Sequence, residues 1–371
     1  MALLAGAGVL GGCSKAPPAG GPLEVLGSFG EVGDSPGQFS YPRCLDSDGS
    51  QLWVIDKQAW VQRVEPGTGV CTLRWRMPEF ENGKPCGVTL FTPPAGGPTR
   101  VYIADTHYHR VMIYDPVVEK GADPLREGGK LLAKFGSYGE GDGQFIFPTD
   151  VGILPTDDGK GVARLYVSEY GGHDRVSVYE PAAGSVPGDE REFVFKFAFG
   201  RFGSGEGAEF SRPQSVEVNT AAHELVITDA CNHRVGRFTY DGKLVAWIGG
   251  PDQAGDGVGQ MKFPYGLVLL GDGTAMVAEY GGNRVQRFDL STGKSLGIFG
   301  QGGRRAGDVA TPWGITRLKD RVYILDSGNN RVQAIALPTG KTPLEAKPEK
   351  AAASAASGAG AGDAKTGGGP G

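Results

Sequence analysis

The sequence predicts an all-β fold: a six-bladed β-propeller of four-stranded antiparallel blades. The first observation is a unit that recurs along most of the chain with a period of about 40 to 50 residues, which is typical of propellers. The second is that three kinds of marker residue occur six times each, always in the same order. The third is that the chain starts with a strand that its last unit lacks.

Each unit starts at a proline, has a strand that ends in an acid, and resumes after a polar turn at an arginine followed by valine. The prolines are Pro42, Pro85, Pro148, Pro213, Pro264 and Pro312. The acids are Asp56, Asp105, Glu169, Asp229, Glu279 and Asp326. The arginines are Arg63, Arg110, Arg175, Arg234, Arg284 and Arg331.

The unit that starts at Pro264 shows the strands in order. Apolar runs at 266–270, 274–278, 284–288 and 294–299 are separated by turns rich in glycine, aspartate and asparagine. This alternation is the signal of antiparallel hairpins, so each unit is predicted to be a four-stranded meander. Insertions at 93–98, 117–129 and 182–191 are then expected on one face of the disc. The acid–arginine turns and the loops that link units are expected on the other face.

The two ends of the repeat region complement each other. The last unit stops after its third strand, at 331–337, whereas residues 23–30 match the fourth strand of the preceding unit. Pairing the first strand of the chain with the last three completes the sixth blade and removes the exposed edges. The domain is therefore predicted to span residues 23–337.

Two motifs carry a family resemblance. Gly141 to Pro148 reads Gly-Asp-Gly-Gln-Phe-Ile-Phe-Pro, and Asp326 to Val332 reads Asp-Ser-Gly-Asn-Asn-Arg-Val. This pattern resembles the NHL repeat family, and it covers roughly residues 23–337. The resemblance implies a six-bladed propeller, in agreement with the count of markers, but it does not identify a ligand.

The N-terminus contains a short apolar run that ends in Leu10-Gly11-Gly12-Cys13. The run is too short to span a bilayer. It resembles the end of a bacterial lipoprotein signal peptide, with Cys13 as the lipidated residue, although no Lys or Arg precedes it. On this reading residues 1–13 are a signal segment, 14–22 a flexible spacer, and a lipid anchor holds the protein at the cell envelope, on its periplasmic or extracellular side. The alternative is an unstructured apolar terminus.

Composition limits the remaining possibilities. Residues 338–371 are rich in Ala, Gly, Lys and Pro and are predicted to be disordered. A formal net charge of −5 argues against a general electrostatic hold on nucleic acid, so we expect no nucleic-acid partner. Cys44, Cys71, Cys86 and Cys231 have no C-x-x-C spacing. Either Cys44 pairs with Cys86, or all four are small, mostly buried apolar side chains.

The acid and the arginine recur in every unit, so we interpret them as structural ties within turns rather than as a site. Function is expected where units differ from one another. The residues that follow the unit-starting prolines should surround the mouth of the central channel: Arg43, Cys86, Thr149, Gln214, Tyr265 and Trp313. The predicted ligand-binding residues are Arg43, Gln214, Tyr265, Trp313, His107, His173 and His233.

Two metals are alternatives to this reading. His107, His173 and His233 suggest zinc if the imidazoles of separate blades converge, and the acidic loops 139–143 and 205–207 suggest calcium. However, no histidine follows a unit-starting proline, unlike in the related peptidylamidoglycolate lyases, and the loops lack an EF-hand spacing. We therefore predict no metal, no cofactor and no catalytic residue. Motifs of nucleotide hydrolases, serine hydrolases and zincins are also absent.

The sequence thus predicts a non-catalytic binding or scaffold propeller on the cell envelope. It would engage a protein, peptide or glycan through the face that bears the acid–arginine turns. The alternative is a metal-dependent propeller enzyme of the lyase or lactonase type.

Overall fold

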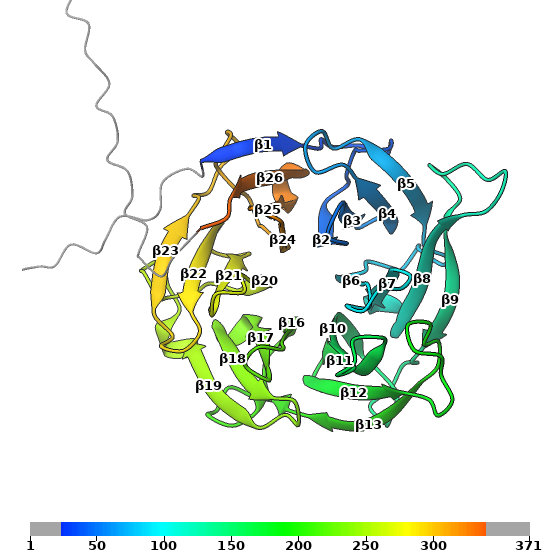
Figure 1. Cartoon of the computed structure of the whole chain (residues 1–371). Coiled ribbons are helices and arrows are strands. Elements are labelled where there is room, and N and C mark those ends of the chain that lie inside the picture. The colour runs from blue at the N-terminus through cyan, green and yellow to red at the C-terminus, as the bar shows by residue number, and fades with distance from the viewer. Residues whose placement is uncertain (1–23, 339–371) are drawn as a thin grey trace, which may run out of the picture.

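Six four-stranded antiparallel sheets are arranged as blades around a common axis (Figure 1), as the sequence predicts. The structure is a computed structural model that describes residues 24–338. The predictions for residues 1–23 and 339–371, including Cys13, lie outside these described residues. No helix within residues 24–338 is long and apolar enough to cross a membrane.

The strands of each blade follow one another from the axis outward. Blade 1 contains β2 (Pro42–Ser47), β3 (Leu52–Asp56), β4 (Trp60–Val64) and β5 (Cys71–Arg76). Blade 2 contains β6 (Gly87–Phe91), β7 (Arg100–Asp105), β8 (Arg110–Val118) and β9 (Gly128–Phe135). Blade 3 contains β10 (Phe147–Pro155), β11 (Val162–Tyr170), β12 (Arg175–Pro181) and β13 (Phe193–Phe199).

The second half repeats this order. Blade 4 contains β16 (Pro213–Asn219), β17 (Glu224–Asp229), β18 (Arg234–Thr239) and β19 (Leu244–Gly249). Blade 5 contains β20 (Pro264–Leu269), β21 (Thr274–Glu279), β22 (Arg284–Asp289) and β23 (Ser295–Phe299). Blade 6 contains β24 (Ile315–Leu318), β25 (Arg321–Asp326), β26 (Arg331–Ala336) and β1 (Val25–Phe29). The short elements are η1 (Thr106–Tyr108), η2 (Ala230–Asn232), η3 (Pro251–Gln253), η4 (Ser327–Asn329) and the parallel pair β14 (Arg201–Phe202) and β15 (Glu209–Phe210).

The N-terminal strand closes the ring. β1 pairs antiparallel with β26, from Val25 opposite Ile335 to Phe29 opposite Val332, and forms the outer strand of blade 6. Figure 1 shows this first strand beside the last one, where the two ends of the domain meet. The closure predicted from the ends of the sequence is confirmed.

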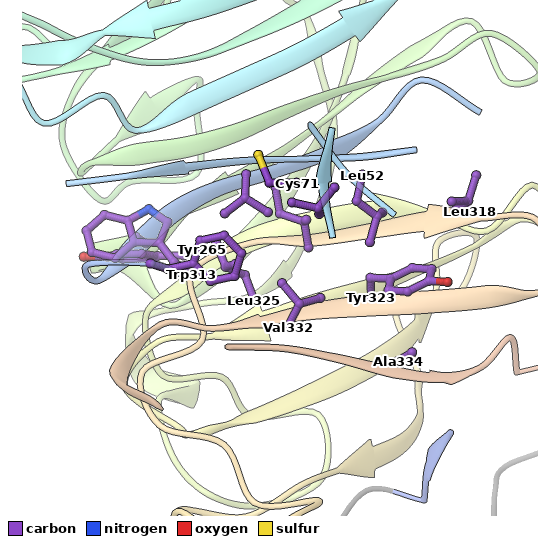
Figure 2. Close-up of a cluster of buried hydrophobic side chains, with 14 residues drawn as sticks. Leu52, Cys71, Tyr265, Trp313, Leu318, Tyr323, Leu325, Val332 and Ala334 are labelled. Atoms are coloured by element: carbon purple, nitrogen blue, oxygen red, sulfur yellow. The ribbon is translucent and has the colours of Figure 1, made fainter. Parts of the chain in front are cut away.

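The core is divided among the interfaces between blades. Six clusters of buried apolar side chains lie at the interfaces between neighbouring blades. The cluster between blades 6 and 1 extends across the axis and also includes Ala230 and Tyr265. In the interface between blades 6 and 1, Leu52 of blade 1 packs with Tyr323 and Leu325 of blade 6 (Figure 2). Because burial of apolar area drives folding, the energy that holds the ring together lies between the blades as well as within them.

The acids at the strand ends bind the loop that enters each blade. In blade 4 the Asp229 carboxylate accepts a hydrogen bond from the Ser211 N–H (2.7 Å) and pairs with Arg234 Nε (2.8 Å). The other nitrogens of Arg234 donate to carbonyls of the loop 204–209. Blades 2, 3, 5 and 6 also pair the acid with the arginine. The repeated motif is a structural clamp, as its recurrence along the sequence predicts.

Blade 1 is the exception, and there the sequence-based alignment is wrong. The arginines of the other blades lie opposite the strand-end acid, but the register of β3 and β4 leaves Trp60 opposite Asp56, three residues before Arg63. Arg63 lies further along β4, where its Nε donates to Thr72 Oγ1 (3.0 Å). The turn of blade 1 is one residue shorter than that of blade 2.

An exchange of side chains between strands compensates for the missing arginine. In blade 1 the Arg74 guanidinium of β5 lies 3.5 Å from the centre of the Trp60 ring and donates to the Asp34 carbonyl (2.6 Å). In blade 4 the Arg234 guanidinium of β18 lies 3.7 Å from the ring of Trp247 on β19. The two pairs occupy equivalent registers with arginine and tryptophan interchanged. The cation–π contact and the hold on the entering loop are therefore both retained.

Removing β1 tests the ring closure. A chain that starts at residue 31 loses the four residue pairs between β1 and β26. At about 1 kcal/mol for each lost hydrogen bond, the melting temperature is expected to fall by roughly 10 °C. The matched control starts at residue 24 and keeps β1. Equal melting temperatures for the two chains, measured by circular dichroism, would contradict the closure.

Candidate functional site

The first strands of the blades line a cavity on the axis of the disc. Its volume is about 270 Å³, and its wall is formed by β2, β6, β10, β16, β20 and the segment that enters β24. Each first strand is the inner edge of its sheet. Four of the predicted binding residues lie in this wall: Arg43, Gln214, Tyr265 and Trp313. Cys86 lines the cavity too, whereas Thr149 is fully buried behind it and donates to the Pro213 carbonyl (2.8 Å).

Aromatic rings gather at the end of the cavity that faces the acid–arginine turns. Tyr265 stacks on Tyr280 with ring centres 4.6 Å apart, and Trp313 meets both rings edge-on. The hydroxyl of Tyr41 lies 3.3 Å from that of Tyr280. Figure 2 shows Tyr265 and Trp313 side by side at one end of the hydrophobic cluster that joins blades 1 and 6. The rings are thus held rigidly by the core.

Two arginines stack on these rings. The Arg43 guanidinium lies 4.6 Å from the Trp313 ring centre, and that of Arg212 lies 4.8 Å from Tyr170 and 5.4 Å from Tyr265. The pKa values of the Tyr170 and Tyr280 hydroxyls are raised, and the positive charges of Arg43 and Arg212 offset part of each shift. Both arginines therefore lie at the same end of the cavity. We call Tyr41, Arg43, Tyr170, Arg212, Gln214, Tyr265, Tyr280 and Trp313 the mouth.

The polar donors of the mouth lack acceptors. Within residues 24–338 neither Arg43 nor Arg212 forms an ion pair. The buried Nε atoms of both, and Nε2 of Gln214, have no hydrogen-bond partner in the described part of the chain. Arg43 Nη1 contacts only a thiol, Cys86 Sγ, at 3.8 Å. Buried donors are nearly always paired in proteins, so three free ones beside a cavity indicate a place for acceptor atoms of a ligand.

Three carboxylates line the cavity away from the mouth. Asp46 accepts from the Leu90 N–H (2.7 Å) and the Thr316 hydroxyl (3.1 Å), which ties blade 1 to blades 2 and 6. Asp150 accepts from the Val216 N–H (3.0 Å) and the Ser215 hydroxyl (3.2 Å), which ties blade 3 to blade 4. No hydrogen-bond donor among the described residues contacts the third carboxylate, Glu217.

The enclosure of these acids shifts their titration. Loss of solvent raises the pKa of Asp46 to about 7 and that of Asp150 to about 6, against the hydrogen bonds that favour their charged forms. Loss of solvent also raises the pKa of Glu217, and repulsion from Asp46 and Asp150 adds to this shift. The lumen therefore contains three acids that keep their protons to higher pH than exposed acids do, and no Lys or Arg of the described residues forms an ion pair with them.

A second, open hollow adjoins the mouth. It lies between blades 1 and 2, shares Tyr41 and Arg43 with the mouth, and contains three further cations: Lys57, Arg76 and Lys84. Glu81 is the only acid in its lining. The turn-bearing face is therefore positively charged around Arg43, which favours the approach of an anionic group.

The predicted histidines are not grouped as metal ligands in the described part of the chain. His107 lies against the Phe147 ring (5.7 Å between centres), and loss of solvent, then Arg43 and Lys84, lower its pKa. Burial and Arg175 lower the pKa of His173. Within residues 24–338 no group of three or more His, Cys, Asp or Glu side chains is placed to hold a metal ion.

Two histidines, His109 and His233, belong to the turns that precede clamp arginines. His109 and His233 adopt the left-handed conformation (φ 56° and 54°) just before the clamp arginine. His233 Nδ1 accepts from the Phe263 N–H (3.1 Å), and His109 Nδ1 contacts the Ile146 carbonyl. Asn330 occupies the same place in blade 6 and accepts from the Tyr41 N–H (2.7 Å). These side chains link consecutive blades.

The four cysteines of the described region are free thiols. Cys44 and Cys71 are buried, in agreement with the reading of the cysteines as small apolar side chains, whereas Cys86 and Cys231 are partly exposed. The Cys44 thiol is placed 3.4 Å from the Pro85 carbonyl and is not bonded to Cys86.

Several residues of the mouth and the lumen were not predicted from the sequence. Tyr41 and Arg212 precede unit-starting prolines, and Tyr170 and Tyr280 follow strand-end acids, so unusual residues beside the markers were the available signal. Asp46, Asp150 and Glu217 are acids inside first strands, which are otherwise largely apolar. An acid in such a strand was a second signal.

Comparison with known proteins supports the fold. No family model matches the sequence, and no curated protein matches it. A streptogramin B lyase resembles it with 16% identity and a TM-score of 0.50, over 85% of this chain and 88% of the other. A protein of unknown function from Bacteroides thetaiotaomicron does so with 14% identity and a TM-score of 0.53, over 85% of this chain and 75% of the other. The PQQ-bound aldose sugar dehydrogenase of Streptomyces coelicolor does so with 18% identity and a TM-score of 0.52, over 86% of this chain and 99% of the other. At these identities the likeness shows the propeller fold alone.

The lumen acids predict a pH effect on stability. An unfolded aspartate has released its proton by about pH 5, whereas folded Asp46 keeps it until about pH 7, so the native state binds more protons in between. The contribution of Asp46 to the free energy of unfolding therefore falls as the pH rises from 5 to 8. Asp46→Asn should reduce the fall in melting temperature over this range, and the exposed control Asp252→Asn should not. Equal pH profiles for Asp46→Asn and the parent would contradict the placement of Asp46.

Proposed function

We propose that this chain is a binding propeller of the NHL type that holds the free carboxylate of a protein or peptide ligand at its mouth. The observation that carries the proposal is the set of unpaired donors on Arg43, Arg212 and Gln214 beside stacked aromatic rings. Arginine suits carboxylates because its planar guanidinium donates two parallel hydrogen bonds. The motifs at 141–148 and 326–332 support the NHL assignment.

The residue types of the mouth also favour tight binding of a ligand. Interface hot spots are enriched in Trp, Tyr and Arg held in desolvated pockets, and the mouth is built largely from these residue types. The side chains are already ordered by stacking and by the core, so little conformational entropy is lost on binding. His107 lies near Arg43 and Lys84 and adds to this face, whereas His173 is placed near Glu140.

Binding at the mouth can be tested with peptides immobilised through their N-termini. We expect the purified full chain to retain peptides with a free C-terminal carboxylate and to release their amides. Arg43→Gln and Arg212→Gln keep most of the side-chain volume but remove a charge, and each should weaken retention about 10-fold, because a charged hydrogen bond contributes about 1.5 to 3 kcal/mol. Arg304, an exposed residue of a loop linking two blades, supplies the matched control Arg304→Gln.

The alternative function, a metal-dependent lyase or lactonase, makes a different prediction for the same protein. Stoichiometric metal in the purified chain that is lost from a His107/His173/His233 triple variant would favour the enzyme over the binding propeller. Equal retention of acids and amides by the parent chain would likewise contradict the proposed mouth. If the parent chain retains uncharged glycans and Arg43→Gln retains them equally well, the binding surface lies outside the mouth.

We further propose that Cys13 carries a lipid that anchors the protein at the cell envelope. The support is the Leu10-Gly11-Gly12-Cys13 sequence, followed by a Pro- and Gly-rich spacer. In a bacterium that processes lipoproteins, the protein should incorporate labelled palmitate, and Cys13→Ala should abolish the label. Cys231→Ala is the control and should keep it. Labelling that persists in Cys13→Ala would refute the anchor.

A further inference from the structure

The mouth and the lumen acids are two ends of one cavity. Arg43 and Gln214 are each the second residue of their first strands, and Asp46 and Glu217 lie three residues further along the same strands, all in the cavity wall. Three residues of an extended strand span about 10 Å. Asp150, on β10, accepts from residues 215 and 216 of blade 4 and therefore lies between these two levels.

The two ends have opposite chemistry. At the mouth, Arg43 is a cation without a carboxylate partner, and Gln214 is only 5% exposed, with an Nε2 that has no partner among the described residues. Both side chains present unused donors to the cavity. Deeper in the lumen, the Glu217 carboxylate presents unused acceptors, with Asp46 and Asp150 as neighbouring acids. A ligand that satisfies both ends must have a negative group at the mouth and a positive group inside.

We propose that the cavity takes the side chain of a C-terminal lysine, with the α-carboxylate on Arg43 and Gln214 and the ammonium facing Glu217 and Asp150. This inference rests on the proposed function, because it names the residue whose carboxylate the mouth holds. Arg212, whose guanidinium lies 5.4 Å from the centre of the Tyr265 ring, adds a second positive charge at the mouth.

The dimensions of lysine fit this placement. An extended lysine separates its carboxylate carbon from its ammonium nitrogen by roughly 7 Å, by standard bond lengths. With a hydrogen bond of about 3 Å at each end, the span is roughly 13 Å. This is a few ångströms more than the separation of the two backbone levels, a difference within the reach of the Arg43 and Glu217 side chains. The cavity of about 270 Å³ lies just below the range of about 300 to 1,000 Å³ typical of drug-sized ligands, which suits one side chain. The methylene groups would pass Tyr265 and Trp313, as lysine stems commonly cover apolar surface.

The lumen acids differ in their freedom to bind. Asp46 and Asp150 are fixed by hydrogen bonds from neighbouring blades, so their carboxyl groups keep their positions when a ligand binds. Glu217 has no such bond and can turn toward an ammonium group. A bound cation would also remove much of the penalty that burial imposes on the charged form of Glu217.

A peptide terminus fits better than free lysine. Free lysine carries a second ammonium next to its carboxylate, and this group would face Arg43 together with Lys57, Arg76 and Lys84 of the adjoining hollow. In a peptide the same nitrogen is an uncharged amide. Gly-Gly-Lys is therefore expected to bind more tightly than L-lysine.

Small probes separate the two ends of the cavity. The full chain is titrated calorimetrically with 6-aminohexanoate, which carries both charged groups, with hexanoate, which lacks the ammonium, and with hexylamine, which lacks the carboxylate. We expect 6-aminohexanoate to bind at least 10-fold more tightly than either of the others. Gly-Gly-Lys, Gly-Gly-Leu and L-lysine form the second series, in which Gly-Gly-Lys should bind most tightly.

Two variants assign the ends. Glu217→Gln keeps the shape of the side chain and should weaken 6-aminohexanoate about 10-fold while leaving hexanoate unchanged. Arg43→Gln should weaken both probes. The exposed Glu206 supplies the matched control Glu206→Gln, which should change neither. Circular dichroism confirms that each variant is folded, and the comparison of probes on the parent chain does not depend on the variants.

The outcomes distinguish this inference from the function on which it rests. If hexanoate binds as tightly as 6-aminohexanoate and Arg43→Gln weakens both, the mouth is correct and the lysine is wrong. If hexylamine binds as tightly as 6-aminohexanoate and Arg43→Gln has no effect, the proposed mouth fails as well. Failure of both 6-aminohexanoate and Gly-Gly-Lys to bind would overturn the inference outright.

Discussion

Closure of the ring is the constraint on which the rest of this structure depends. Each blade buries its faces only against its two neighbours, so a gap anywhere would expose an apolar face of both adjoining sheets. β1 removes the gap by completing blade 6 with a strand from the other end of the chain. Closure also brings the first residues of all six inner strands around one axis. Residues as distant in sequence as Arg43 and Trp313 become neighbours for this reason.

The same constraint explains why the most regular part of the sequence has a structural role. Every blade must hold the loop that enters it, and the clamp of acid and arginine does so in five blades. Blade 1 achieves a similar result with Trp60 and Arg74. A requirement that recurs six times selects a repeated motif, whereas a unique site needs residues that do not repeat. The mouth is made of such residues.

The sequence predicted the fold well because its signals are local and repeated. Turn residues, alternating strands and complementary ends were sufficient for the blades and their closure. Arg63 was misplaced because the exchange of arginine and tryptophan involves β4 and β5 together, and only the strand register reveals it. Four of the predicted binding residues line the cavity because the first residues of inner strands must meet at the axis.

The rest of the site depends on contacts between blades, which a single sequence does not contain. Thr149 is turned away from the cavity by hydrogen bonds to Ser168 and Pro213. Arg212 joins the mouth because its side chain stacks on Tyr170 and Tyr265, rings supplied by two other blades. The opposition of a basic mouth and an acidic lumen emerges only when β2, β10 and β16 are placed around one cavity.

The most direct test of the account is a crystal structure of the full chain soaked with Gly-Gly-Lys. The account predicts density on the axis, with the terminal carboxylate at Arg43 and Gln214 and the lysine nitrogen near Glu217. Density for the peptide on the outer strands, or in the cavity with the two charged ends reversed, would contradict it.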